Sequence, residues 1–418
     1  MCQPYDADRA EHPLTPDMQA PTPVGTVLTT SPAFASFLPI VHQRPSSRPT
    51  ASILSTYPPT QCGFATFTAS LACALEDEGV PVSIVRIADG SPSASPRVVG
   101  ELDSGSAKSV AAASELLNRS DIAIIQHEYG LFGGMDGEEI LDVIDGLRIP
   151  LIVVVHTVQR MPSTHQRSVL EAVAARADHL IVTSRAAADQ LRGSYGVSPR
   201  QITVIPQGLT IPTGKAVVRG GRPTLLTCGL LRPGKGIERV IEAMGSLHTL
   251  PGQPRYVIAG PTDPKELAAH GEAYRERLKD HVCRMGLQGA VVFDDRPRGR
   301  AAVTGLLQTA AVVVLPYDST DQVSSGMLVD AIAAGRPTVA TAFPHAVEVM
   351  AHGTGTVVDH DDPEQLVSAL FQVLTQPRLA GTMAAEARRL AQDLSWPAIG
   401  ARYHTVVGSV LVQRSRRG

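Results

Sequence analysis

The chain has 418 residues, 43% of them hydrophobic, and a formal net charge of −3 at neutral pH. This length predicts two or three domains, and the apolar content excludes a chain that is disordered throughout. Because the small net charge gives no overall basic field, we do not expect a nucleic acid partner.

The cysteine pattern and the lack of long apolar runs predict a cytoplasmic protein. The five cysteines show no metal-ligand spacing, which favours reduced thiols; they are Cys2, Cys62, Cys73, Cys228 and Cys283. No apolar run reaches the roughly 18 residues that a membrane span needs. The N-terminal stretch lacks the basic start and apolar segment of a signal peptide, so cytoplasmic residence is the expectation.

Residues 1–48 are rich in Pro, Ser and Thr and lack periodicity, which predicts a disordered extension. From 49 to 210, apolar runs bounded by turn residues alternate with helical patterns, the first of which ends at Gly79. The runs lie at 51–57, 80–87, 120–129, 149–157, 177–184 and 201–208. Strands of this kind are typical of a parallel sheet covered by helices on both faces.

The alternation of apolar runs and helical patterns stops at 211–222, where Gly, Pro and basic residues gather, so we place a linker between two domains there. It resumes over 223–394, with helices expected at 236–248, 264–286, 363–375 and 379–393. The apolar runs there lie at 223–231, 255–260, 290–295, 310–317, 336–341 and 355–360. Residues 395–418 predict a helical tail that either packs back on the N-terminal domain or contacts a membrane surface. Two α/β domains of similar size imply a cleft between them, a preferred place for small ligands.

Residues 229–236, GLLRPGKG, predict a site for a diphosphate. A strand ends there, Arg232 and Lys235 lie in a turn rich in Pro and Gly, and Gly236 opens an amphipathic helix. The free N–H groups of a helix N-terminus attract anions, and two cations would offset the charge of a departing phosphate. An ordinary surface turn with solvated cations is the alternative for this stretch alone.

A second stretch, DQVSSGMLVD at 321–330, places polar residues where a strand leads into a helix. The carboxylate of Asp330 is suited to accept both hydroxyl groups of a ribose. Ser324, Ser325 and Gly326 offer N–H and hydroxyl groups to a phosphate or a sugar. In the alternative reading, Asp330 and Ser324 only cap the helix. Capping does not require the small loop and the apolar strand before it, so we favour a ligand site.

Together these stretches resemble the C-terminal half of the retaining GT-B glycosyltransferases of group 1 and family 4, which use nucleotide-activated sugars. The match continues in AIAAGRPTVAT, and VTSRAAADQL with VIPQGL resembles the N-terminal half, so the resemblance covers most of 50–395. It implies an α/β fold of two Rossmann-like, doubly wound parallel-sheet domains facing a central cleft. It also implies that Asp330 holds the ribose, and that Arg232 and Lys235 hold the diphosphate.

One position departs from the family pattern. Eight residues before Asp330 stands Gln322, where the family usually has a glutamate that contacts the transferred sugar. Glutamine can still form hydrogen bonds but brings no negative charge. The resemblance implies that this loop binds the donor through Gln322, Ser324, Ser325, Gly326 and Met327.

The N-terminal half contributes three further candidate stretches, each following a predicted strand. TYPPTQCGFATF contains Gly63, which lets backbone approach a ligand closely. IIQHEYGLFGG contains His127 and Glu128, and VVVHTV contains His156. Because the carboxyl ends of parallel strands meet at one edge, these residues should converge on the cleft. By resemblance, the loop of Gly63 lies against the donor phosphates and the acceptor, and His156 contacts the transferred sugar. His127 and Glu128 are placed for the acceptor.

The resemblance implies an enzyme that transfers a hexose from a nucleotide diphosphate sugar to a hydroxyl of a glycan, lipid or small molecule, with retention. We assign His156, Arg232, Lys235 and Gln322 to catalysis, and expect no metal or other cofactor because two cations and a helix terminus balance the phosphates. A non-catalytic nucleotide-sugar-binding subunit is the first alternative, because of Gln322. A GT-B sugar-nucleotide epimerase is the second; it would need carboxylates beside the sugar, and Glu128 is the one candidate.

Overall fold

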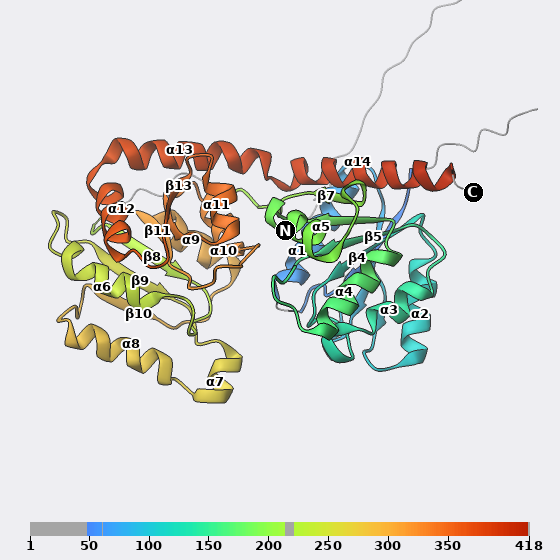
Figure 1. Cartoon of the computed structure of the whole chain (residues 1–418), viewed down its shortest axis with the longest axis horizontal. Coiled ribbons are helices and arrows are strands. Elements are labelled where there is room, and N and C mark those ends of the chain that lie inside the picture. The colour runs from blue at the N-terminus through green and yellow to red at the C-terminus, as the bar shows by residue number, and fades with distance from the viewer. Residues whose placement is uncertain (1–47, 61, 214–220, 417–418) are drawn as a thin grey trace, which may run out of the picture. The chain divides into compact units, whose positions relative to one another are not determined.

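The structure is a computed structural model that describes residues 48–60, 62–213 and 221–416. Figure 1 shows the order of its helices and strands. The extension predicted for 1–48 lies outside the described residues apart from Arg48, and most of the predicted linker does as well. The described residues from Arg48 onward belong to one compact unit.

The N-terminal half is built on a parallel sheet with the strand order β3-β2-β1-β4-β5-β6-β7. The strands are β1 Ala51–Ser55, β2 Val82–Ile87, β3 Val98–Leu102, β4 Ile122–His127, β5 Leu151–Val155, β6 His179–Val182 and β7 Ile202–Val204. Strand β1 pairs with both β2 and β4, and Leu54 lies opposite Ile125. The chain changes direction across the sheet between β1 and β4, which is where open α/β sheets bind ligands.

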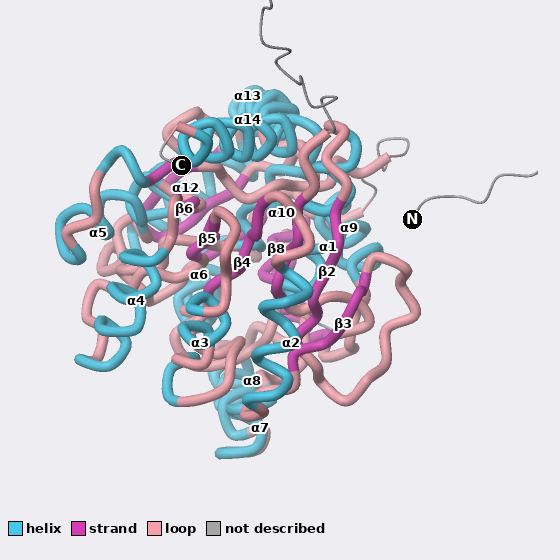
Figure 2. The backbone as a smooth tube through the Cα atoms, turned by 90° about the vertical axis from the view of Figure 1, so that its right-hand side faces the viewer, coloured by secondary structure: helices cyan, strands magenta, loops and turns pink. Residues whose placement is uncertain are grey.

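Helices cover both faces of this sheet, as Figure 2 shows. One face packs against α2 Ala107–Leu117, α3 Ile140–Asp145, α4 Thr164–Arg176 and α5 Arg185–Tyr195. The other face packs against α1 Gly63–Asp77 and α14 Trp396–Ser415. Two short 3-10 helices, η1 Met135–Gly137 and η2 Pro199–Gln201, complete this half. The alternation of strands and helices follows the apolar runs of the sequence.

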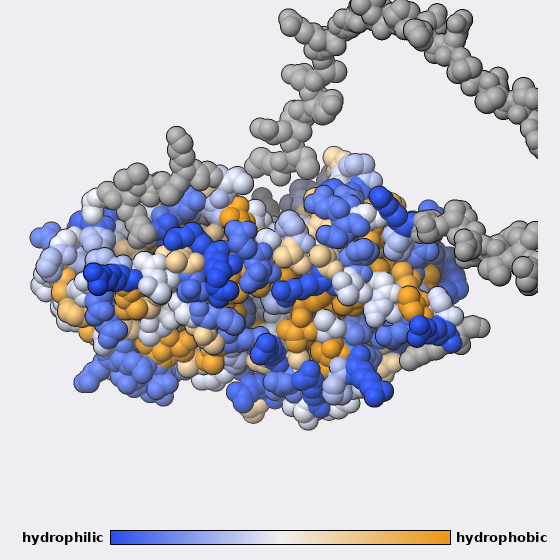
Figure 3. Space-filling view, turned by 90° about the horizontal axis from the view of Figure 1, so that it is seen from above, coloured by the Kyte–Doolittle hydropathy of each residue, from blue (hydrophilic) through white to orange (hydrophobic). Residues whose placement is uncertain are grey.

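Helix α14 belongs to the core of the N-terminal half although it is last in the chain. Ile399, Tyr403 and Val407 are buried on it. A Cβ atom at Gly400 would lie 2.8 Å from the Cβ of Ala74, so glycine allows α14 to approach α1 closely. Seen from above, hydrophilic side chains cover much of the molecule, with smaller apolar groups between them (Figure 3). The apolar side of the tail is thus used in packing, and its membrane contact stays a prediction.

A second parallel sheet, with the order β10-β9-β8-β11-β12-β13, forms the C-terminal half. Its strands are β8 Thr224–Cys228, β9 Arg255–Ala259, β10 Val291–Asp294, β11 Val312–Leu315, β12 Thr338–Thr341 and β13 Gly355–Val358. Helices α6 Ile237–Leu247, α8 Ala273–Arg284 and α12 Pro363–Thr375 cover one face. Helices α9 Arg300–Thr309, α10 Gly326–Ala333 and α11 Pro344–Met350 cover the other, and α13 Pro377–Asp393 contributes to both.

Two sequence predictions need correction. The single helix predicted for 264–286 is wrong, because two helices occupy this stretch. Helix α7 Pro264–His270 is followed by Gly271, whose φ of +60° leaves the helical region, and α8 begins at Ala273. Strand β3 was missed, because it is a half-exposed edge strand with alternating burial and a central glycine, Gly100. In the part of the chain that the structure describes, no helix is both long and apolar enough to cross a membrane.

Candidate functional site

The turn between β8 and α6 is held against the loop that follows β11. Gly236 has a φ of +62°, and a Cβ atom there would lie 1.7 Å from the carbonyl oxygen of Pro316. The N–H of Asp318 donates to the carbonyl of Gly234 at 3.0 Å. Only glycine therefore fits at 236. The two loops lie together at the carboxyl ends of β8 and β11, the neighbouring strands between which the strand order of this sheet reverses, which is its switch point.

Two cations project from this turn with little counter-charge. The ammonium of Lys235 lies over the ring of Tyr317, and burial, with the charge of Arg232 beside it, lowers the pKa of Lys235 to about 8. The Nε atom of Arg232 is 4.0 Å from a carboxylate oxygen of Asp263, and its side chain is 58% exposed. A phosphate entering here would supply the negative charge that the turn lacks.

The loop before α10 uses many of its polar groups internally. The amide of Gln322 donates to the carbonyl of Ser324 at 2.9 Å. The N–H of Ser325 donates to Nδ1 of His345 at 2.9 Å, and burial lowers the pKa of His345 to about 4. The Ser325 hydroxyl accepts the N–H of Leu328 at 3.3 Å. Ser325 thus caps α10, whereas the alternative reading of the sequence named Asp330 and Ser324.

Asp330 lies on α10 after Gly326 and Met327, the first two residues of that helix. Its carboxylate is 3.6 Å from the guanidinium of Arg300, and burial raises the pKa of Asp330. The predicted ribose ligand therefore has a cationic neighbour that the sequence pattern did not reveal.

His156 is the first residue after β5 and is held on several sides. Its ring lies edge-on to Phe64 and Phe67, with centroid distances of 4.9 and 5.0 Å. Its Nε2 atom is 2.9 Å from Oε1 of Gln126. A Cβ atom at Gly63, the first residue of α1, would meet no atom of the described residues within 4 Å, so no close contact with them requires glycine there.

His127 and Glu128 differ in accessibility. The side chain of His127 is 1% exposed, and neither ring nitrogen has a hydrogen-bond partner among the described residues. Burial lowers the pKa of His127 to about 4. Glu128 accepts hydrogen bonds from the hydroxyl of Thr157 and the N–H of Tyr129, and burial raises its pKa. In this structure His127 is enclosed, so its predicted contact with an acceptor would require the surrounding loop to move.

A cavity of about 690 Å³ brings part of the predicted set together. Five of the predicted residues line it, namely His156, Arg232, Lys235, Gln322 and Ser324. The other predicted residues do not, namely Gly63, His127, Glu128, Ser325, Gly326, Met327 and Asp330. Sequence reasoning missed Thr157, Tyr317 and Asp318, which also line it. Each of the three follows the end of a strand by no more than three residues, and this position in the sequence could have identified them.

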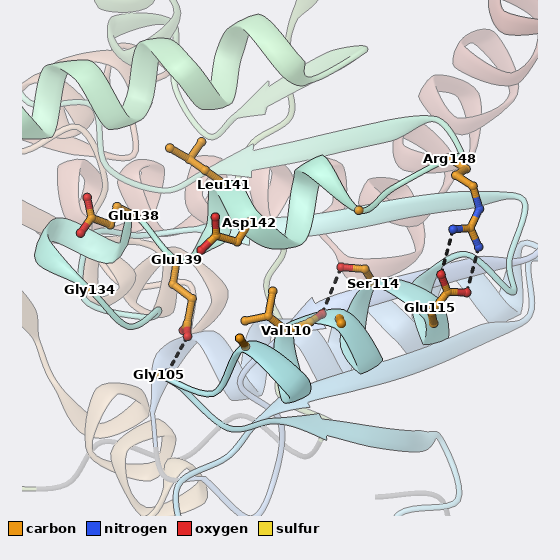
Figure 4. Close-up of a pocket in the computed structure, with 13 residues that line it drawn as sticks. Gly105, Val110, Ser114, Glu115, Gly134, Glu138, Glu139, Leu141, Asp142 and Arg148 are labelled. Atoms are coloured by element: carbon orange, nitrogen blue, oxygen red, sulfur yellow. Dashed lines mark hydrogen bonds and ion pairs between the residues drawn. The ribbon is translucent and has the colours of Figure 1, made fainter.

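A larger cavity, of about 910 Å³, lies in the N-terminal half between α2 and α3 (Figure 4). Several of its charged groups serve internal contacts. Glu139 accepts the N–H groups of Gly105 and Gly133, and Glu115 forms an ion pair with Arg148 at 2.8 Å. Within the described ranges no three His, Cys, Asp or Glu residues form a group able to hold a metal ion. We place the candidate site at the smaller cavity, which is lined by Arg232 and Lys235, the two cations with little counter-charge.

Comparisons with known proteins agree with this architecture. A family model described as Glycosyltransferase Family 4 matches residues 62–211, and one described as Glycosyl transferases group 1 matches residues 222–376. D-inositol 3-phosphate glycosyltransferase from Thermobifida fusca is 27% identical over 278 residues, covering 59% of this chain and 61% of that protein. The protein of that name from Kineococcus radiotolerans is 28% identical over 250 residues, covering 53% and 55%. The matched region thus spans between about half and three fifths of the length of these curated relatives.

Solved structures show the same fold. Sucrose-phosphate synthase from Thermosynechococcus elongatus superposes with a TM-score of 0.70 at 20% identity, over 88% of this chain and all of that one. HepE from Anabaena, solved in complex with UDP, superposes with a TM-score of 0.65 at 16% identity, over 86% and 100%. With two matching family models, two parallel sheets and a cationic turn at the sheet switch point, the chain belongs to the group 1 and family 4 glycosyltransferases of the GT-B fold.

Proposed function

We propose that the protein transfers a hexose from a nucleotide diphosphate sugar to a hydroxyl group of an acceptor, with retention of the anomeric configuration. One observation carries the proposal: Arg232 and Lys235 line the same cavity of about 690 Å³ as His156 and Gln322. Cations on one wall suit a diphosphate, and hydrogen-bonding side chains in the same cavity suit a sugar.

In this proposal catalysis is mainly electrostatic and positional. Arg232 and Lys235 stabilise the negative charge that builds on the leaving diphosphate as the glycosidic bond to the phosphate breaks. His156 and Gln322 hold the sugar, and Asp330 holds the ribose. The acceptor oxygen bonds to the anomeric carbon on the face that the phosphate leaves, and a phosphate oxygen takes the acceptor's proton. This course requires orientation of the substrates and no covalent bond to the protein.

Two further points stay proposals. HepE has been solved with UDP-glucose, which supports a nucleotide sugar as the donor class here. The acceptor is a hydroxyl compound of a class to be determined. We also keep the prediction that transfer needs no metal ion or other cofactor. Cytoplasmic residence stays a prediction too, with contact between the tail and a membrane surface as an open alternative, and cell fractionation tests both.

A thermal-shift screen of UDP-, GDP-, ADP- and dTDP-hexoses is the first test, because a ligand that binds the native state raises the melting temperature. The donor that shifts it should then be turned over with a panel of hydroxyl acceptors, with NMR of the product's anomeric proton to read the configuration. An inverted product would contradict retention, and the absence of any stabilising nucleotide sugar would contradict the proposal.

A non-catalytic sugar-nucleotide-binding subunit is the second candidate, favoured by the uncharged Gln322 that donates to Ser324. Slow donor hydrolysis distinguishes the two, because an active transferase releases some free nucleotide diphosphate in the absence of an acceptor. A protein that binds the donor and releases none over many hours would support the non-catalytic role.

A further inference from the structure

A chain of hydrogen bonds links helix α1 to His156 through strand β4. The hydroxyl of Thr68 donates to the carbonyl of Phe64 at 2.8 Å. The Nε2 atom of Gln126 donates to Oγ1 of Thr68 at 2.7 Å, and Oε1 of Gln126 is 2.9 Å from Nε2 of His156. Thr68 and Gln126 are fully buried, so water cannot replace these bonds.

We call this chain of hydrogen bonds the relay; its four groups are the carbonyl of Phe64 and the side chains of Thr68, Gln126 and His156. The chemistry of these groups fixes which atom donates in each hydrogen bond. A threonine hydroxyl has a single proton, and here it is directed to the carbonyl of Phe64, so Thr68 must accept from the Gln126 amide nitrogen. The amide oxygen of Gln126 then faces His156. Because that oxygen can only accept, the proton between the two residues belongs to Nε2 of His156.

The other ring nitrogen of His156 is left as an acceptor. Burial and the neighbouring His127 lower the pKa of His156 to about 3, so the ring is neutral near pH 7. A neutral imidazole that carries its proton on Nε2 has a lone pair on Nδ1. Among the described residues the His156 side chain forms its hydrogen bond at Nε2 and none at Nδ1, and His156 lines the cavity of Arg232 and Lys235.

We propose that Gln126 is a positioning residue that fixes His156 as the Nε2–H tautomer, so that Nδ1 accepts a hydrogen bond from a sugar hydroxyl. The biological role rests on the function proposed above, whereas the tautomer rests on the relay alone. Phe64 and Phe67 restrict the ring by their edge contacts, and the N–H of His156 donates to the carbonyl of His127 at 3.1 Å.

This tautomer has a consequence for donor choice. An acceptor nitrogen pairs with the O–H of a hexose, but it faces the lone pairs of a hexuronate carboxylate without a proton between them. The relay therefore selects neutral hexoses over hexuronates at the sugar position that meets His156. A ring that carries its proton on Nδ1 would instead donate to a carboxylate and would favour hexuronates.

Two other histidines provide internal standards for a direct measurement. His345 accepts an N–H at Nδ1, so its neutral ring carries the proton on Nε2. His248 has Nδ1 2.8 Å from the carbonyl of Met244, so its neutral ring carries the proton on Nδ1. At pH 8, nitrogen-15 NMR of the ligand-free protein distinguishes the two tautomers of a neutral imidazole. The signal that is lost in the His156→Asn variant belongs to His156. We expect His156 to match His345; a match to His248 or a tautomer mixture overturns the proposal.

Variants then test the role of Gln126. Gln126→Leu should give a tautomer mixture at His156 and lower kcat/KM about tenfold, the value of one hydrogen bond. Thr68→Ser keeps the hydroxyl and should keep the wild-type spectrum. Gln201→Leu is the matched control, because the Gln201 amide bonds to the carbonyls of Ala174 and Ala177 in the same half, away from His156. If Gln126→Leu leaves the His156 signals unchanged, Gln126 does not fix the tautomer.

Gln126→Glu adds a readout that a purely structural role would not move. A carboxylate beside Nε2 stabilises the imidazolium, so the pKa of His156 should rise from about 3. As pH falls through that raised pKa, Nδ1 gains a proton and stops accepting, so kcat/KM should acquire an acidic limb. An unchanged His156 pKa overturns the proposal. A confirmed tautomer with no donor turnover by the wild type would instead contradict the proposed function and leave the relay intact.

Discussion

The Nζ atom of Lys235 lies 4.3 Å from the centroid of the Tyr317 ring. An aromatic face attracts a cation without neutralising it, so the ammonium keeps its capacity to pair with an anion. Tyr317 is itself buried and stacks on Phe343 at a centroid distance of 5.3 Å. The cation thus rests on a rigid surface at the edge of the cavity, and we expect it to move little when a diphosphate binds.

Removal of this cation should slow the reaction strongly. We expect Lys235→Ala to lower kcat by about 10²–10³-fold, or roughly 3–4 kcal/mol, by analogy with loss of one oxyanion donor. Lys235→Arg should retain part of the activity because it keeps the charge. Lys279→Ala, at a solvent-exposed position on α8, is the matched control. Steady-state kinetics measure all three, and wild-type turnover in Lys235→Ala would contradict the phosphate assignment.

Donor binding should depend on pH through the same residue. Burial and the neighbouring charge of Arg232 lower the pKa of Lys235 to about 8, so the ammonium is charged below that pH and neutral above it. A bound diphosphate favours the charged form, raises this pKa and causes proton uptake. The dissociation constant of the nucleotide diphosphate should therefore rise above pH 8, by up to about tenfold per pH unit.

Isothermal titration calorimetry in buffers of different ionisation enthalpy measures both the affinity and the protons taken up. Lys235→Arg is the control, because arginine stays charged over this range and should give a flat profile. If the wild-type affinity is constant from pH 7 to 9, the lysine does not contact the diphosphate.

Sequence reasoning succeeded where the information is local. The cationic turn from Arg232 to Gly236 lies within one short segment, and parallel strands make continuous apolar runs, so both were predicted. Contacts between distant segments were not. The N–H of Ser325 donates to His345, which is 20 residues away, and the tautomer of His156 depends on Gln126, which is 30 residues away. A sequence pattern identifies such residues as polar and near a strand end but does not show which atoms meet.

Asp330 provides a prediction that separates binding from catalysis. Asp330→Asn should weaken nucleotide binding about tenfold through loss of charged hydrogen bonds to the ribose, while kcat at saturating donor changes less. Arg300→Gln is the matched variant, because it removes the ion-pair partner and leaves the carboxylate. Calorimetry with the nucleotide diphosphate measures both affinities. If Asp330 only holds Arg300, both variants would lower the melting temperature alike and leave nucleotide affinity unchanged.

Restoring the usual glutamate at 322 should not increase activity. The Gln322 amide donates to the carbonyl of Ser324, and a carboxylate cannot donate, so Gln322→Glu places two acceptors against each other. We expect a loss of about 1 kcal/mol in the free energy of unfolding and a turnover equal to or below wild type. Gln322→Ala is the control that removes the donor without adding charge. Denaturant unfolding and donor turnover test this prediction. If the wild type is inactive and Gln322→Glu gains activity, the result would instead support the non-catalytic subunit, because the absence of a carboxylate at 322 would then explain the inactivity of the native protein.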